Sequence, residues 1–348
     1  LLPILLAEGV DFLSLYRNLG AEAWTKTIEL AHAAGLEVWG PSGDAMPFPD
    51  ALAAGQDGFV YLDSLLPLFQ REVDGVERLE QVDWEIVQPL AFKKHIAALV
   101  EADAACMPML RATAMRLDPI LTPEETVARY LRYLAAHYAG WWMGERQVRE
   151  RVARENEDFH ALGARVVAKQ AKLMMLLEEA GARLVPGSGS PHPWLMPGVG
   201  LVEELELWQA AGLTPERVLH AATSQAALNL GLGETHGRLA PGLVADIACF
   251  TADPRLDVAN LREPALVVVR GQVLSREILD ELEQGLLDDM AARHQAEVEP
   301  LDVAPPSRPE GEVVMEGFVE NRTNGIRISA ERWCVVREPD GTLAFCGR

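Results

Sequence analysis

This 348-residue sequence lacks the residue spacings by which common metal and disulfide motifs are recognised. None of its eight histidines forms an H-x-H or H-E-x-x-H pattern, and its four cysteines form no C-x-x-C pair. Neither a zinc ribbon nor a disulfide-dense framework is therefore indicated. No apolar run approaches the roughly 18 to 20 residues that span a bilayer, so the sequence predicts a soluble chain without a membrane span.

Basic residues are scarce relative to acidic ones. The chain has 31 lysines and arginines against 52 aspartates and glutamates, a formal net charge of −21, and no run of Lys and Arg. This charge disfavours binding to nucleic acid or to an anionic lipid surface. The expected partners are a small-molecule ligand, another protein, or further copies of this chain in a homo-oligomer.

The sequence begins at Leu1 within an apolar segment that leads directly into Gly9-Val-Asp-Phe. From this start in mid-pattern we expect a truncated or processed product of a longer chain. The sequence leaves both a cytoplasmic and an exported location open.

Short apolar strands alternate with amphipathic helices in the first part of the sequence. Strands are predicted at 12–16, 37–40 and 58–62, and a helix at 21–34. In that helix Trp24, Ile28 and Ala31 recur at i, i+4 and i+7. Repeated βα units predict an α/β fold with a parallel sheet, either a barrel or a doubly wound sheet.

The middle of the chain is mostly helical, with one apolar stretch at 104–110 that suits a further strand. Thr122-Pro-Glu-Glu forms a capping box, from which we expect one helix whose apolar stripe continues to Tyr138. His137 lies on that stripe, and Trp141-Trp142 are expected to pack in a core or an interface. A strand at 183–186 follows, and Thr214-Pro215 is expected to begin a helix.

Short β segments replace the βα pattern after Gly237. Strands are predicted at 245–250 and 265–269, followed by a helix at 277–295, a proline-rich linker at 300–309 and β segments up to the end. A hairpin loop at 338–342 would place Cys334 opposite Cys346. A cross-strand disulfide is conceivable there, although two small apolar neighbours are the favoured interpretation.

The segment from Val185 to Val273 resembles the carboxy-terminal part of amidohydrolase-superfamily enzymes, particularly their imidazolonepropionase-like and prolidase-like branches. The residues that carry this resemblance are Val185-Pro-Gly-Ser-Gly-Ser, Glu203-Glu-Leu, Ala211-Gly-Leu-Thr-Pro, Ala221-Ala-Thr, Gly237-Arg-Leu-Ala-Pro-Gly, Ala245-Asp-Ile and Val267-Val-Val-Arg-Gly. The opening segment is similar to the same family at Gly9-Val-Asp-Phe-Leu and Ala31-His-Ala-Ala-Gly-Leu-Glu-Val. No single one of these segments is specific for the family, but their combination is.

The resemblance implies a partial TIM-type (β/α) barrel with a small composite β-domain and a C-terminal β-extension. Residues 1–235 would form the later strands of the barrel, 236–275 the small β-domain, 276–299 a helix, and 300–348 a linker and a β-hairpin extension. The first barrel strands of the family would precede Leu1.

The resemblance also implies metal-dependent hydrolysis of C–N bonds in amides, cyclic amides or dipeptides. Family members hold one or two divalent metals at the C-terminal strand ends, and an aspartate on the last strand takes a proton from water. Here Ser14 stands where one branch carries a carboxylated lysine, and Pro41 stands where a histidine is expected. Tyr61 replaces a second histidine, and Gly189 replaces the aspartate.

These replacements predict a catalytically inactive or impaired relative that carries no cofactor. An alternative is an active amidohydrolase that binds zinc or another divalent metal at a relocated site, using His192 and Tyr61 with Asp44 or Asp63. A third interpretation is a non-catalytic barrel that binds a ligand or a protein. His192, Ser188 and Arg111 are the pocket candidates.

Overall fold

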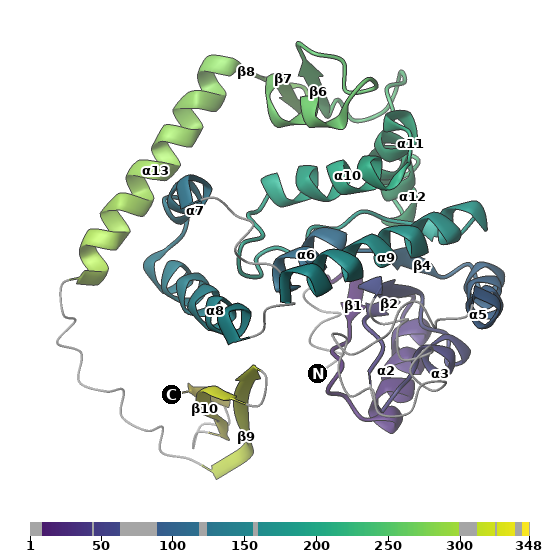
Figure 1. Cartoon of the computed structure of the whole chain (residues 1–348), viewed down its shortest axis with the longest axis vertical. Helices are drawn as coiled ribbons and strands as arrows, with labels where there is room; N and C mark the ends of the chain where they lie inside the picture. Colours follow the sequence, from purple (N-terminus) through teal and green to yellow (C-terminus); the bar gives the residue numbers. More distant parts are fainter. Residues whose placement is uncertain are drawn as a thin grey trace. The chain divides into compact units, whose positions relative to one another are not determined.

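The computed structural model describes residues 9–43, 45–62, 89–117, 124–155, 159–298, 312–323, 326–337 and 343–347. The chain divides into two units, Leu1–His294 and Gln295–Arg348, which are treated separately below. Figure 1 shows the order of the elements along the chain.

A parallel sheet of five short strands lies at the centre of the first unit. Its strands follow one another in chain order and are β1 (Phe12–Ser14), β2 (Glu37–Gly40), β3 (Gly58–Val60), β4 (Ala105–Met107) and β5 (Arg183–Leu184). The parallel sheet expected from the βα pattern is thus confirmed, including the strand within 104–110. The strands described here form an open sheet, and no closed barrel is seen among them.

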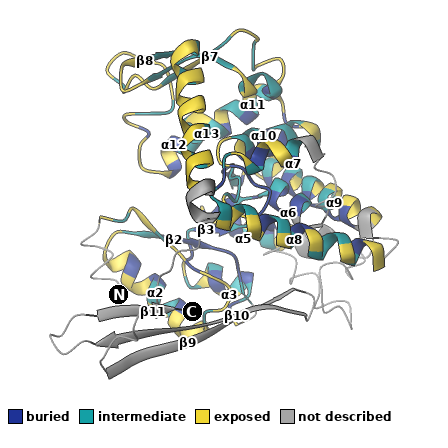
Figure 2. Cartoon of the chain, turned by 90° about the vertical axis from the view of Figure 1, so that its left-hand side faces the viewer, coloured by how far each residue is buried: buried dark blue, intermediate teal, exposed yellow. Residues whose placement is uncertain are grey.

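Successive side chains of these strands point to opposite faces of the sheet. One face contributes Val38, Phe59, Cys106 and Leu184, all fully buried, to the largest hydrophobic cluster. The opposite face contributes a much smaller cluster around Trp39, Ala105 and Val185, and Figure 2 shows how burial varies along the elements. The sheet is therefore stabilised mainly from one side.

Helices cover the heavily packed face. They are α2 (Ala21–Ala33), α3 (Phe48–Ala53), α5 (Pro89–Glu101), α9 (Phe159–Glu179) and α10 (Val199–Ala211), each of which places side chains in the largest cluster. In α2 the buried residues are Trp24, Ile28 and Ala31, as the spacing predicts. Burial at this face raises the pKa of the Cys106 thiol to about 12.

The buried amide of Gln56 ties two strands to a helix. Its Nε2 donates to the carbonyl oxygens of Gly40 and Gly58, both at 2.9 Å, and its Oε1 accepts from the Trp24 indole at 2.9 Å. Both amide atoms therefore have partners, which removes the cost of burying them.

Three further helices, α6 (Leu110–Leu117), α7 (Glu124–Leu131) and α8 (Ala136–Glu155), carry a second hydrophobic cluster. The single helix expected to run from the capping box to Tyr138 is wrong, because α7 ends at Leu131 and the chain turns through backbone hydrogen bonds from Tyr133 and Leu134 before α8 begins. Thr122 and Pro123 lie outside the described residues, as does the side chain of Glu125.

Two short helices and a small antiparallel sheet follow. The helices are α11 (Pro215–His220) and α12 (Ala226–Asn229), separated by a π-helical turn, Ala221–Gln225. The Thr214 hydroxyl accepts from the Arg217 amide and begins α11 as expected. The small sheet contains β6 (Ile247–Phe250), β7 (Pro264–Val269) and β8 (Gln272–Ser275), and a 3-10 helix, Val258–Arg262, precedes β7.

Helix α13 (Arg276–Val298) confirms the helix expected in this part of the chain. The second unit contains a three-stranded antiparallel sheet of β9 (Glu312–Thr323), β10 (Ile326–Arg337) and β11 (Leu343–Gly347). Its register sets Cys334 opposite Cys346, as counted from the sequence. The disulfide and the division of the chain into four segments stay predictions. The linker at 300–309 and the loop at 338–342 lie outside the described residues. Within the described part of the chain, no helix is both long and apolar enough to cross a membrane.

Candidate functional site

The substituted positions lie at one edge of the five-stranded sheet. Ser14 is the last residue of β1, Pro41 follows β2 directly, and Tyr61 follows β3. Gly189 lies in the loop that follows β5. Because the carboxyl ends of parallel strands meet at the same edge, these positions share the place where barrel enzymes of this architecture carry their active sites. We call this edge the mouth.

Position 189 is closely surrounded by apolar atoms. A Cβ atom there would lie 3.2 Å from both Ala112 Cβ and Leu195 Cδ1, and 3.9 Å from the Tyr61 hydroxyl. Gly189 has φ +71°, in the left-handed region that side chains rarely adopt. The backbone and the packing at this position thus both favour glycine over a larger residue.

Ser188 and His192 lie close to Gly189, as expected from the sequence. The Ser188 hydroxyl donates to Ser190 Oγ at 3.1 Å, and the Ser190 hydroxyl donates to the Leu195 carbonyl oxygen at 2.7 Å. The His192 amide donates to the Gly189 carbonyl oxygen at 3.1 Å, which turns the loop back toward the mouth. Ser188 is thus engaged within its own loop, whereas His192 is exposed.

Arg111 belongs to a network that joins α6 to α10. Its Nε donates to Glu203 Oε2 at 2.8 Å, and the Tyr130 hydroxyl donates to Glu203 Oε1 at 3.0 Å. Burial raises the pKa of Tyr130, and the neighbouring Glu203 carboxylate adds to that rise. Arg111 therefore holds a helix in place rather than presenting its Nε to a ligand.

Glu204 is fully buried and holds the first residues of α6. Its carboxylate accepts from the backbone amides of Leu110 and Arg111, at 2.9 and 2.6 Å, and from the Trp208 indole at 2.8 Å. Burial raises its pKa to about 7, outweighing the opposing effect of these three donors. The sequence marks Glu203 and Glu204 only as part of a family pattern, and their contacts with α6 could not be read from it.

The four residues at the strand ends do not fit a zinc-type metal site. Zinc sites are built from imidazole, thiolate and carboxylate groups, whereas Pro41 and Gly189 offer no side-chain donor and Ser14 and Tyr61 offer only hydroxyls. Over the described residues, no group of three or more His, Cys, Asp or Glu side chains could hold a metal ion. Asp44 and Asp63, the carboxylates of the relocated-site interpretation, lie outside the described residues.

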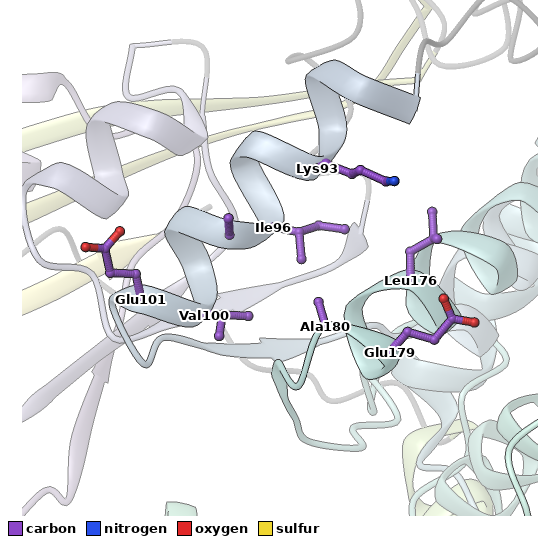
Figure 3. Close-up of a pocket in the computed structure, with 8 residues that line it drawn as sticks. Lys93, Ile96, Val100, Glu101, Leu176, Glu179 and Ala180 are labelled. Atoms are coloured by element: carbon purple, nitrogen blue, oxygen red, sulfur yellow. The ribbon is translucent and has the colours of Figure 1, made fainter.

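A surface pocket of about 510 Å³ lies between α5 and α9, away from the mouth (Figure 3). Its lining residues are Lys93, Ile96, Ala97, Val100, Glu101, Leu176, Glu179 and Ala180. Glu101 and Ala180 come just before β4 and β5, so this end of the pocket lies near the amino ends of the strands. The pocket therefore lies toward the opposite edge of the sheet from the candidate site.

Two expectations for aromatic residues on α8 need correction. His137 is exposed and does not lie on an apolar stripe, because α8 begins only at Ala136. Trp142 is fully buried as expected, but Trp141 is 44% exposed. Adjacent residues on a helix point in different directions, so a Trp-Trp pair cannot be buried as a unit on one helix face.

Comparison with known proteins shows similarity at the level of structure only. No family model and no curated protein sequence matches the chain. Bottromycin amidohydrolase has a TM-score of 0.63 and 21% identity, with 83% of this chain and 61% of that protein covered. Ochratoxinase from A. niger has a TM-score of 0.51 and 15% identity, covering 78% of this chain and 52% of that protein.

A putative prolidase from Bifidobacterium longum has a TM-score of 0.50 and 21% identity, with 82% of this chain and 61% of that protein covered. The chain thus spans less than two thirds of each of these proteins. The expected resemblance to the amidohydrolase superfamily is confirmed by this likeness of fold, and the chain has the α/β architecture seen in amidohydrolases and prolidases.

Proposed function

We propose that this chain derives from a metal-dependent amidohydrolase, no longer hydrolyses C–N bonds, and uses its mouth to bind a ligand. The observation that carries the proposal is the chemistry of the four strand-end positions. None of them bears an imidazole, a carboxylate or a lysine amine, the groups from which the family's metal sites are built.

The packing at position 189 supports the same conclusion. An aspartate there would have to adopt a left-handed backbone conformation and press against Ala112 and Leu195. The backbone and the neighbouring side chains thus support glycine rather than a carboxylate at this position.

The alternative, an active enzyme with a relocated metal, has one observation in its favour. The Tyr61 hydroxyl lies 3.9 Å from the Cβ position of residue 189, and the His192 backbone turns back to Gly189. Tyr61 and His192, whose side chains carry an oxygen and nitrogens, thus belong to segments next to position 189, where the family carries its catalytic aspartate. Tyrosine is a poor ligand while protonated, because its ordinary pKa is about 10.

The test is metal analysis combined with a hydrolysis assay. Protein purified without added metal would be analysed for zinc, manganese and iron per chain, then assayed on small amides and dipeptides with each metal supplied. We expect no stoichiometric metal and no metal-dependent hydrolysis. The proposal is overturned by bound metal together with hydrolysis that is lost in both Tyr61→Phe and His192→Ala, whereas hydrolysis unaffected by either variant identifies a contaminating enzyme.

A further inference from the structure

Four exposed rings form a continuous row from α8 to the loop that follows β5. The ring centroids of His137 and Tyr138 are 4.4 Å apart, those of Tyr138 and Trp141 are 6.3 Å apart, and those of Trp141 and His192 are 6.4 Å apart. All four residues are exposed in the chain. We call these residues the ring row.

Buried aromatic residues hold the ring row in place from behind. Trp142 and Trp194 are both fully buried, and their ring centroids are 5.4 Å apart. Trp142 is the neighbour of Trp141 on α8, and Trp194 lies two residues after His192. The α8 side and the loop side of the row are thus fastened to each other through the core, which fixes the spacing of the exposed rings before any ligand arrives.

The ring row ends at the mouth. Its last member, His192, belongs to the turn that its own amide closes on the Gly189 carbonyl oxygen. Position 189 in turn lies beside Tyr61, which follows β3. A molecule lying on the row could therefore extend toward the strand ends.

We propose that the ring row binds a planar aromatic ligand, neutral or cationic, at the rim of the mouth. Aromatic faces attract other rings through offset or edge-to-face packing and attract cations through the ring quadrupole. Contiguous exposed apolar surface is uncommon on soluble proteins unless it binds something. The imidazoles of His137 and His192 add polar groups to the two ends of the row.

Charge selects among aromatic ligands. The net charge of −21 disfavours anions near the surface and favours cations. Near the row the charges are of both signs, since Glu145 pairs with Arg149 at 3.5 Å and the Arg146 guanidinium lies 5.8 Å from the ring centroid of Trp194. From the net charge of the chain and the quadrupole of the exposed rings, we expect an aromatic cation to bind better than an aromatic carboxylate of similar size.

This inference rests on the ligand-binding role proposed for the mouth, but not on the loss of hydrolysis. The two are separable by experiment. Aromatic binding together with metal-dependent hydrolysis would overturn the proposed loss of hydrolysis and support the ring row as a binding site. Absence of both hydrolysis and aromatic binding would overturn only the inference about the ring row.

The experiment measures binding of benzamidine and N-acetylphenylalanine amide by titration calorimetry, with cyclohexanecarboxamidine and benzoate as comparators. We expect saturable binding of both aromatic probes, weaker binding of the saturated amidine, and the weakest binding of benzoate. Trp141→Leu should weaken binding by at least about tenfold, because a central aromatic contact typically contributes more than about 1.4 kcal/mol. His192→Ala should weaken it by a smaller factor.

The matched control is Leu256→Ala, which removes a side chain that is 79% exposed and far along the chain from the ring row. Its binding should equal that of the unaltered protein. Thermal unfolding monitored by circular dichroism shows whether each variant folds. If Trp141→Leu does not fold, the His192→Ala variant tests the inference, because His192 is exposed. The inference is overturned if neither aromatic probe binds, or if binding is unchanged in both variants.

Discussion

Two regions of this protein use polar side chains in contrasting ways. Between the sheet and its helices, the buried amide of Gln56 and the buried carboxylate of Glu204 each have hydrogen-bond partners for both of their terminal atoms. At the mouth, Pro41 and Gly189 contribute no polar side-chain atom at all. Gln56 and Glu204 therefore connect helices and strands of the fold, whereas these two mouth positions offer no side-chain donor or acceptor.

The contrast also separates the residues that stabilise the fold from those at the strand ends. The strand ends of a barrel enzyme carry its chemistry, whereas the packing of helices on the sheet carries its stability. In this chain the largest cluster involves side chains from every helix that covers the sheet. Gly189 is the mouth position where the two roles meet, because its Cβ position lies 3.2 Å from both Ala112 and Leu195.

The largest effect is expected for Glu204→Ala, which leaves the amides of Leu110 and Arg111 and the Trp208 indole buried without their acceptor. We expect the free energy of unfolding to fall by about 3–5 kcal/mol, because each buried donor left without an acceptor costs about 1–3 kcal/mol and three donors are affected. Urea denaturation of the two proteins measures this change in the free energy of unfolding. Glu206→Ala is the control, because Glu206 pairs with Arg262 at a part-exposed site and should cost less than about 1 kcal/mol. Equal losses in both variants would contradict the contrast drawn here.

A smaller effect is expected from an attempt to restore the catalytic carboxylate with Gly189→Asp. The left-handed backbone and the 3.2 Å approaches to Ala112 and Leu195 should lower stability by about 1–3 kcal/mol. Metal binding should not appear, because the neighbouring strand ends still lack ligands. Gly9→Asp is the matched control, since Gly9 has φ +73° with no atom within 4 Å of its Cβ position. A stable, metal-loaded Gly189→Asp protein would show that the site is less degraded than proposed.

A third effect concerns the dependence of stability on pH. The folded pKa of Glu204, about 7, lies above its ordinary value of 4.5, so between these values the folded chain holds more protons than the unfolded chain. This group's contribution to stability is complete below pH 4.5 and is lost as the pH rises through about 7. Glu204→Gln carries no ionisable group there, so its unfolding free energy should fall less over this window. Parallel pH profiles for the two proteins would refute the assignment.

Local patterns in the sequence predicted much of the fold. The spacing of Trp24, Ile28 and Ala31 identified the buried face of α2, and Thr214 identified the start of α11, because both signals act within one or two helical turns. The turn before Ala136 was missed, since nothing in that stretch breaks a helix locally. Leu134 in this turn is buried in the second hydrophobic cluster, and tertiary packing of this kind overrides local propensity.

The candidate site could be predicted only in part. The strand-end positions followed from the family resemblance and fall at a shared edge of the sheet, and Ser188 and His192 lie near Gly189. The contact between Trp141 and His192 joins segments far apart in sequence, so no local pattern reveals it. The same holds for the binding of Glu204 to the start of α6.

The buried thiol of Cys106 can be used to measure how often the sheet and its helices separate. This thiol is fully buried between sheet and helices and has a raised pKa, so a thiol reagent can attack it only after the layers separate. The rate at which Cys106 is alkylated therefore reports how often the sheet opens. Exposed Cys249, on the small sheet, is free to react without any opening and sets the reference rate.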